Sequence, residues 1–302
     1  MGTLGWYVLS AFAVVATALV YRDARARLPR TSARIWTAVT LVTAGLASPA
    51  YLIARPSRGS TWGLSEVVAV PVFFLLAILP IAILLESWAV RRGFLSPFGS
   101  IVAVMLVQNI ALGGVSLYVA LVKYRLRPAS LGVTGGAWTR RLLAAAIASG
   151  AALAGNFIGQ NITVFATGLF VGQQAAAELI SQREADTPVF RMLQEFRAPA
   201  EMATLVVLVA VVVPIGEELF FRGLTYGALR HVMNRHAAVL TSAVFFAAAH
   251  LQLVEFLPIL ILGMVLAYLY EFTGSLVPGM IAHGVNNLGA LALFYMTRLP
   301  SP

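Results

Sequence analysis

Long apolar runs recur along this chain, and they constrain its fold more than any other feature of its sequence. A helix that crosses the ~30 Å hydrocarbon core of a bilayer needs about 20 mostly apolar residues. By this criterion we expect spans at residues 4–21, 35–54, 66–88, 101–122, 142–171, 202–230, 237–250, 256–270 and 275–294. Lipid offers no hydrogen-bond partners, so each of these segments has to satisfy its backbone internally as a helix. The sequence therefore predicts an all-α fold, a polytopic transmembrane helix bundle with about eight or nine spans.

Composition agrees with a membrane protein and excludes other classes. The 302 residues are 60% hydrophobic and 11% charged, whereas soluble domains are about 45–50% apolar and about 25% charged. The net charge of +9 comes from arginines beside apolar runs, the pattern that membrane topology requires. We therefore predict a multi-pass integral protein of the cell membrane that binds no nucleic acid. The chain has no cysteine, which excludes disulfides, thiolate catalysis and cysteine metal ligands.

Polar residues gather in one long segment between the apolar runs, residues 172–200. We interpret it as an interfacial or extramembrane helix pair that breaks at Thr187-Pro188, because the residue before a proline disfavours helical dihedrals. Glu255 and Glu271 fall at the ends of expected spans, and we expect both to be solvated.

Three ionisable residues lie within six positions of an apolar run, in the segment Val213-Pro-Ile-Gly-Glu-Glu-Leu-Phe-Phe-Arg222. Such groups cost at least a few kcal/mol each at membrane depth and usually face the interior of a bundle. Glu218 and Arg222 are four residues apart, so a helix places them on one face, where they can pair. Glu217 points about 100° away from Glu218 and has no oppositely charged partner on its own helix.

Further polar groups lie in two later apolar runs, in Phe246-Ala-Ala-Ala-His250 and His283-Gly-Val-Asn-Asn287. His283 and Asn287 are four residues apart and project from one helical face. A glutamate in an apolar pocket can act as a general base on water, and an asparagine can donate a hydrogen bond to an oxyanion. This set of groups suits amide hydrolysis. Glutamate with two histidines is equally a known zinc set, so a metal site remains an alternative.

Each residue also has a purely structural interpretation. Glu218 and Arg222 can form a structural ion pair, and Glu217 can be protonated and hydrogen-bonded. Phe246 can serve in packing, and asparagines at positions 286 and 287 can join helices by hydrogen bonds worth about 0.6 kcal/mol each. The occurrence of all these groups within about one hundred residues favours a shared site over separate structural roles.

The motifs Glu-Glu-x-x-x-Arg, Phe-x-x-x-His and His-x-x-x-Asn, in this order, resemble the signatures of the CPBP intramembrane protease family. That family includes the Ras-converting CAAX prenyl endopeptidases and bacterial abortive-infection and bacteriocin-processing homologues. The resemblance covers about residues 204–290 and extends more weakly back to 142. It predicts a catalytic helical core at 142–296, whereas residues 1–122 form an N-terminal transmembrane extension whose role the resemblance does not indicate.

The resemblance implies an intramembrane endopeptidase in which Glu217 and His250 activate water while His283 and Asn287 form the oxyanion site. Glu218, Arg222 and Phe246 would support the site. The family has been described both as metalloproteases and as metal-free glutamate proteases. The expected cofactor is therefore either none or a single divalent metal such as zinc, held by Glu217, His250 and His283.

Two other functions fit the same residues. One is a catalytically idle membrane factor, such as a bacteriocin immunity protein or a scaffold, and the other is an ion or proton pathway. The expected partners are membrane lipid and a peptide or membrane-protein substrate. Arginine-rich, lysine-poor usage is typical of a high-GC bacterium, where prenylated proteins are rare, so we do not transfer a CAAX substrate to this chain.

Overall fold

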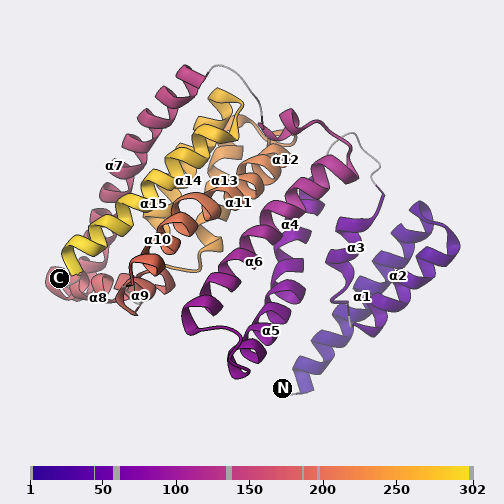
Figure 1. The fold of residues 1–302 in the computed structure, drawn as a ribbon. Helices are drawn as coiled ribbons and strands as arrows, with labels where there is room; N and C mark the ends of the chain where they lie inside the picture. Colours follow the sequence, from indigo (N-terminus) through magenta and orange to yellow (C-terminus); the bar gives the residue numbers. More distant parts are fainter. Residues whose placement is uncertain are drawn as a thin grey trace.

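The computed structural model describes residues 3–43, 45–56, 62–133, 138–185, 187–195 and 198–298, and these residues contain helices and no strand (Figure 1). The elements of the first half are α1 (Thr3–Arg27), α2 (Arg30–Val42), α3 (Ser48–Ala54), α4 (Leu64–Phe73), η1 (Phe74–Ile78), α5 (Leu79–Arg91), α6 (Pro97–Leu117), η2 (Tyr118–Lys123) and η3 (Pro128–Leu131). The second half contains α7 (Trp138–Val171), α8 (Gln173–Ala185), α9 (Pro188–Glu195), α10 (Pro199–Val207), η4 (Leu208–Val212), α11 (Val213–Glu218), η5 (Leu219–Tyr226), α12 (Gly227–Arg230), α13 (Arg235–Ala249), α14 (Phe256–Thr273) and α15 (Leu276–Arg298). The polytopic helical bundle predicted from the sequence is confirmed.

Six helices of the described residues are long and apolar enough to cross a membrane: Leu64–Arg91, Pro97–Lys123, Trp138–Val171, Pro199–Arg230, Phe256–Thr273 and Leu276–Thr297. The expected span at 237–250 is the shorter apolar helix α13, of 15 residues. The expected span at 4–21 lies within α1 (Thr3–Arg27), and some of its side chains are outside the described ones. Six long apolar helices make the chain a multi-pass integral membrane protein.

The prediction of one span at residues 35–54 is wrong. Helix α2 ends at Val42 and α3 begins at Ser48. Between them Gly45 has a φ of +88°, in the left-handed region that an α-helix cannot use. Pro49 then stands at the start of α3, where its missing N–H costs nothing.

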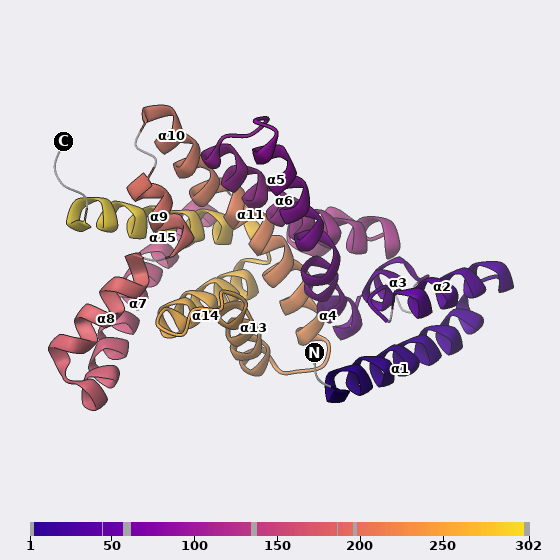
Figure 2. The ribbon, with the colours of Figure 1, turned by 90° about the horizontal axis from the view of Figure 1, so that it is seen from below.

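The helices form three groups side by side. Helices α1–α3 lie at one end, α4–α6 in the middle, and α7 with α13–α15 at the other end (Figure 1). The helix that runs from α10 to α12 lies between the middle group and α15, and it contacts both α6 and α15. Seen from below, α8 and α9 lie beside the ends of α7 and α15 (Figure 2). The break predicted at Thr187-Pro188 separates α8 from α9.

Close approach between α7 and α14 depends on small residues. A Cβ atom at Gly159 would lie 3.0 Å from the Cα atom of Pro258, and one at Gly155 would overlap Ile261. On the opposite side of α7, large side chains such as Phe157 and Phe165 are exposed, at 70% and 61%. A bundle that leaves such side chains uncovered is suited to lipid as its surroundings.

The helix that carries the Glu-Glu motif departs from α-helical geometry just before it. The N–H of Val213 bonds to the carbonyl oxygen of Leu208, five residues back, and Pro214 has no N–H to donate. The carbonyl oxygen of Val209 is therefore left without a donor on its own helix and is available to a neighbouring one.

Candidate active site

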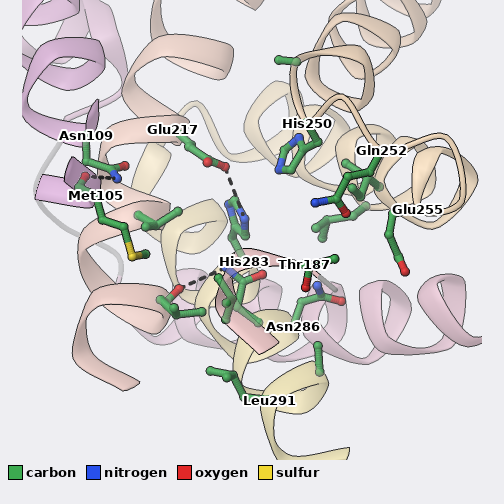
Figure 3. A pocket seen from close by; sticks show the side chains of 18 of the residues that line it. Met105, Asn109, Thr187, Glu217, His250, Gln252, Glu255, His283, Asn286 and Leu291 are labelled. Carbon is green, nitrogen blue, oxygen red and sulfur yellow. Dashed lines mark hydrogen bonds and ion pairs between the residues drawn. The ribbon is translucent and has the colours of Figure 1, made fainter. Parts of the chain in front are cut away.

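A cavity of about 500 Å³ opens between α6, α9, α11, α13, α14 and α15. Glu217 on α11, His250 after α13, and His283 and Asn287 on α15 all line it (Figure 3). The fold thus brings these four side chains to one hollow, although 70 residues separate the first from the last.

The Glu218–Arg222 pair predicted from the spacing is present and buried. Arg222 Nη1 donates to Glu218 Oε1 at 2.8 Å, and each side chain is 1% exposed. Arg222 also donates to the carbonyl oxygen of Gly263 on α14, and its guanidinium lies 4.4 Å from the centre of the Phe246 ring. A buried arginine held by a carboxylate, a carbonyl group and an aromatic face has little freedom to move.

His283 lies between both glutamates of the motif. Its Nδ1 is 3.2 Å from Glu218 Oε1, and its Nε2 is 3.7 Å from Glu217 Oε2. Gly279, one helical turn earlier on α15, leaves room for this arrangement, because a Cβ atom there would lie 2.9 Å from Glu218 Oε2. Sequence reasoning missed the contact between Glu218 and His283, which joins residues 65 positions apart.

These contacts constrain where protons sit. Glu218 already accepts from Arg222, so its oxygen accepts the N–H at Nδ1 of His283. The Nε2 atom then faces Glu217, and one more proton has to lie between these two atoms for them to bond. With that proton, two carboxylates, one guanidinium and one imidazole carry no net charge. A neutral cluster avoids the cost of an unpaired charge in a buried site.

His250 stands where α13 ends, and its ring is fixed by its own helix. Its Nδ1 lies 2.8 Å from the carbonyl oxygen of Phe246, so Nδ1 carries the proton and Nε2 is left as an acceptor. The next residue, Leu251, has a φ of +55°, which ends the helix. The Phe246 ring is fully buried and meets His250 and His283 edge-on, with centroids 4.8 and 5.7 Å away.

Asn287 has a structural contact as well as a place on the cavity. Its Nδ2 donates to the carbonyl oxygen of Val209 at 3.0 Å, the oxygen that Pro214 leaves without a helical donor. Gly284 on the same helix lies against the backbone of Ala210, where a Cβ atom would overlap the carbonyl oxygen. One amide proton of Asn287 remains available to the cavity.

Helix α6, which precedes the expected catalytic core, forms one wall of the cavity through Met105 and Asn109. It approaches α11 closely at Gly216, where a Cβ atom would lie 2.7 Å from Asn109 Oδ1. Gly113 on α6 faces the same contact, 3.3 Å from the Cα atom of Gly216. The N-terminal spans therefore contribute side chains to the cavity. The division of the chain at residue 122 stays a prediction.

The proposed metal ligands do not form a metal centre in this geometry. Across the ranges that the structure describes, no group of three or more His, Asp or Glu side chains is arranged to hold an ion. His283 bonds Glu218 through one ring nitrogen and faces Glu217 through the other, while the Nδ1 of His250 is taken by a carbonyl group. We therefore derive no step through a metal.

Residues 199–289 match the family model described as type II CAAX prenyl endopeptidase Rce1-like. Over this segment, less than half of its length, the chain is similar to that family. The match begins at α10 and ends within α15, so it contains Glu217, His250, His283 and Asn287. Searches of curated proteins and of solved structures found no match.

Two glutamates within the matched segment differ from expectation. Glu255 lines the cavity and is partly buried, in contact with Glu184 of α8. Burial, and then this neighbouring carboxyl group, raise the pKa of Glu255 to about 7. Glu271 accepts a hydrogen bond from the hydroxyl group of Tyr226 at 2.6 Å. The expectation of a solvated side chain is wrong for Glu255, whereas Glu271 stays partly exposed beside its partners on the Glu-Glu helix.

Proposed function

We propose that this protein is an intramembrane endopeptidase that hydrolyses a peptide bond with water activated by Glu217 and His250. The observation that carries the proposal is the shared cavity, lined by these two side chains and by His283 and Asn287. The Rce1-like match supports the reaction class. The contacts around Glu218 support a role for His283 in the reaction, because they orient its ring without occupying the cavity.

In the proposed reaction, Glu217 takes a proton from water as the water oxygen bonds to the carbonyl carbon of the substrate. His250 accepts the other water hydrogen at Nε2, which holds the water in line. The developing oxyanion receives hydrogen bonds from Nε2–H of His283 and from the free amide proton of Asn287. The Glu218 carboxylate stabilises the imidazolium form of His283 that this step requires, and Arg222 holds Glu218 in place.

Collapse of this intermediate completes the reaction. The carbon–nitrogen bond breaks while Glu217 returns its proton to the leaving nitrogen, so the products are a carboxylic acid and an amine. The 3.7 Å separation of Glu217 and His283 is longer than a hydrogen bond, and such distances shorten when substrate displaces bulk water.

The test uses purified protein in detergent micelles and a peptide library read by mass spectrometry. Glu217→Gln keeps the shape of the side chain but accepts no proton, so its cleavage of the peptides should fall below detection. His250→Ala should lose nearly all of its cleavage activity. Loss of a general base costs roughly 10²–10⁴-fold. Asn287→Ala should keep measurable activity, because one oxyanion donor contributes about 10²–10³-fold.

Two results would contradict the proposal. Unchanged cleavage by Glu217→Gln would exclude the mechanism, and an inactive wild-type protein across the library would favour a catalytically idle factor. A parallel assay with a tight chelator reports on the cofactor. Loss of cleavage there would make Glu217 and the histidines metal ligands instead of acid–base groups.

A further inference from the structure

One carboxamide of α15, Asn286, lines the cavity and takes no part in the reaction steps proposed above. The residue is 4% exposed, and its Oδ1 has no hydrogen-bond partner. In the view of Figure 3, Glu217 lies on one side of His283 and Asn286 on the other. A buried acceptor without a partner destabilises the folded protein. We therefore expect this atom to meet a donor when the cavity is occupied.

The place of Asn286 on its helix connects it with the proposed oxyanion site. It follows His283 by three residues and precedes Asn287 by one, so all three side chains spread over one side of α15. Asn287 turns toward η4, where its Nδ2 donates to the carbonyl oxygen of Val209. Asn286 points about 100° away from Asn287. A peptide whose scissile carbonyl group meets His283 and Asn287 therefore has Asn286 beside it.

Carboxamide side chains recur along the wall of the cavity. Those in the lining are Gln108, Asn109, Asn156, Gln252, Asn286 and Asn287. Each carboxamide offers an N–H donor and a carbonyl acceptor, the same groups as a peptide unit. Among the described residues, the lining includes no lysine or arginine for an anionic ligand to meet. Walls of this kind suit a ligand whose polar groups are N–H and C=O groups, as in a peptide backbone.

A peptide cleaved within a membrane needs such partners for its backbone. The segment around the scissile bond has to leave its helix, and its N–H and C=O groups then lack partners in surroundings that offer none. In an extended backbone, the N–H and the C=O of one residue point to the same side. When that C=O meets the oxyanion donors on α15, the N–H of the same residue is directed at the same wall.

We propose that Asn286 binds the substrate backbone. Its Oδ1 accepts a hydrogen bond from the N–H of the residue that carries the scissile carbonyl group, in a peptide held extended. The last torsion of an asparagine side chain is broad, so its amide can turn this oxygen to the peptide. The proposal rests on the proteolytic function above. It names the substrate class as segments that unwind into an extended conformation and are recognised through their backbone.

The test measures binding and does not depend on cleavage. The probe is the fluorescently labelled peptide of the same library that the Glu217→Gln protein binds most tightly, measured by fluorescence anisotropy in micelles. In a series of this peptide, one amino acid at a time is replaced by its α-hydroxy acid. Each replacement exchanges a single N–H for oxygen and nearly keeps the shape of the chain. At the residue that carries the scissile carbonyl group, the exchange should weaken binding about tenfold, the contribution of one hydrogen bond.

Variants of Asn286 on the Glu217→Gln background assign this loss. In Asn286→Leu, the amide and the ester should bind equally well at that position. Asn286→Ala removes the same acceptor with a smaller side chain and should behave alike even if Asn286→Leu folds poorly. Asn286→Asp keeps an oxygen acceptor and should preserve the loss. Asn161→Leu is the matched control, because it makes the same change at an exposed position of α7 outside the cavity lining, and it should also preserve the loss.

The proposal is overturned if the ester series gives the same losses with and without the Asn286 side chain, or if no library peptide binds Glu217→Gln. A loss that depends on Asn286 at another residue than the one with the scissile carbonyl group would overturn it too. Failure of proteolysis would look different. A wild-type protein that cleaves nothing, while one ester position depends on Asn286, would retain backbone binding and exclude the peptidase. Cleavage without any such position would do the reverse.

Discussion

At the scale of single residues, the motif glutamates have different surroundings. Glu217 faces the cavity and one histidine, whereas Glu218 is enclosed by Arg222 and His283. The spacing of residues along one helix separates these roles, because neighbours on a helix point about 100° apart. Phe246 joins both histidines and Arg222 through its ring, so its part extends beyond the packing role that its apolar surroundings suggest.

Removal of Arg222 should destabilise the protein strongly. Arg222→Ala leaves Glu218 buried beside Glu217 without its cation, and the loss of one partner of a buried pair costs about 3–5 kcal/mol. Arg230→Ala is the matched control on the same helix, since the pair with Glu271 is partly exposed and such pairs contribute about 0–1 kcal/mol. Thermal unfolding in micelles measures both. Equal melting temperatures for Arg222→Ala and the wild-type protein would contradict the buried pair.

At the scale of elements, the position of Glu217 depends on how closely α11 approaches α6. Gly216 and Gly113 face each other across this contact, so backbone meets backbone where side chains elsewhere keep helices apart. On the other side, Asn287 of α15 bonds the carbonyl oxygen of Val209 that Pro214 leaves free, and Gly284 lies against the carbonyl oxygen of Ala210. Small residues and one irregular helical turn therefore set the width of the cavity.

Gly216→Ala should lower both stability and activity. The added Cβ atom would lie 2.7 Å from Asn109 Oδ1 and 2.9 Å from the Asn109 carbonyl oxygen, and overpacking of this kind costs about 1–3 kcal/mol. The shift of α11 would also move Glu217. Gly114→Ala is the control, because nothing lies within 4 Å of its added atom. It should be neutral or stabilising by about 0.5–1 kcal/mol. A normal melting temperature for Gly216→Ala would show that the contact is looser.

At the scale of the whole molecule, polar contacts connect the groups of helices. The only lysine of the chain, Lys123, donates to Glu66 of α4 and to the carbonyl oxygen of Leu52 on α3, both at 2.7 Å. Trp62 donates to the carbonyl oxygen of Leu224 on the Glu-Glu helix. Contact between Glu255 and Glu184 brings α8 to the turn before α14. These contacts hold separate helix groups around one cavity.

Stability should fall as the pH rises from about 4.5 to 7. Burial first, and Glu184 second, raise the pKa of Glu255 from 4.5 to about 7, so the folded protein binds more protons than the unfolded chain in this window. The free energy of unfolding then decreases by roughly 1–3 kcal/mol in total as the pH rises to about 7. Above that pH it no longer changes through this group.

Melting temperatures of the wild-type protein and of Glu255→Gln, measured across this window, check this prediction. The variant lacks the titrating group, so its curve should be flatter than that of the wild-type protein. A slope that persists in Glu255→Gln would assign the effect to other groups.

The sequence by itself determined the membrane class, most helices and the pairing of Glu218 with Arg222. Each of these follows from local regularity, either a run of apolar residues or a spacing of four along one helix. The same regularity located Glu217, His250, His283 and Asn287 as candidates. It failed at residues 35–54, where the backbone of Gly45 interrupts an apolar run that composition alone presents as continuous.

Only the tertiary structure decided which helices face one another. That arrangement fixes the second contact of His283, the cavity wall supplied by α6 and the contact between Glu255 and Glu184. These contacts join residues 65 or more positions apart, as for His283 and Glu218 or Glu255 and Glu184. Helical periodicity states the direction of a side chain relative to its own axis. The distance to another helix depends on where glycines allow close packing and where a helix is irregular. Whether a glycine or an irregular turn leads to a close contact depends on the neighbouring helix as much as on its own helix.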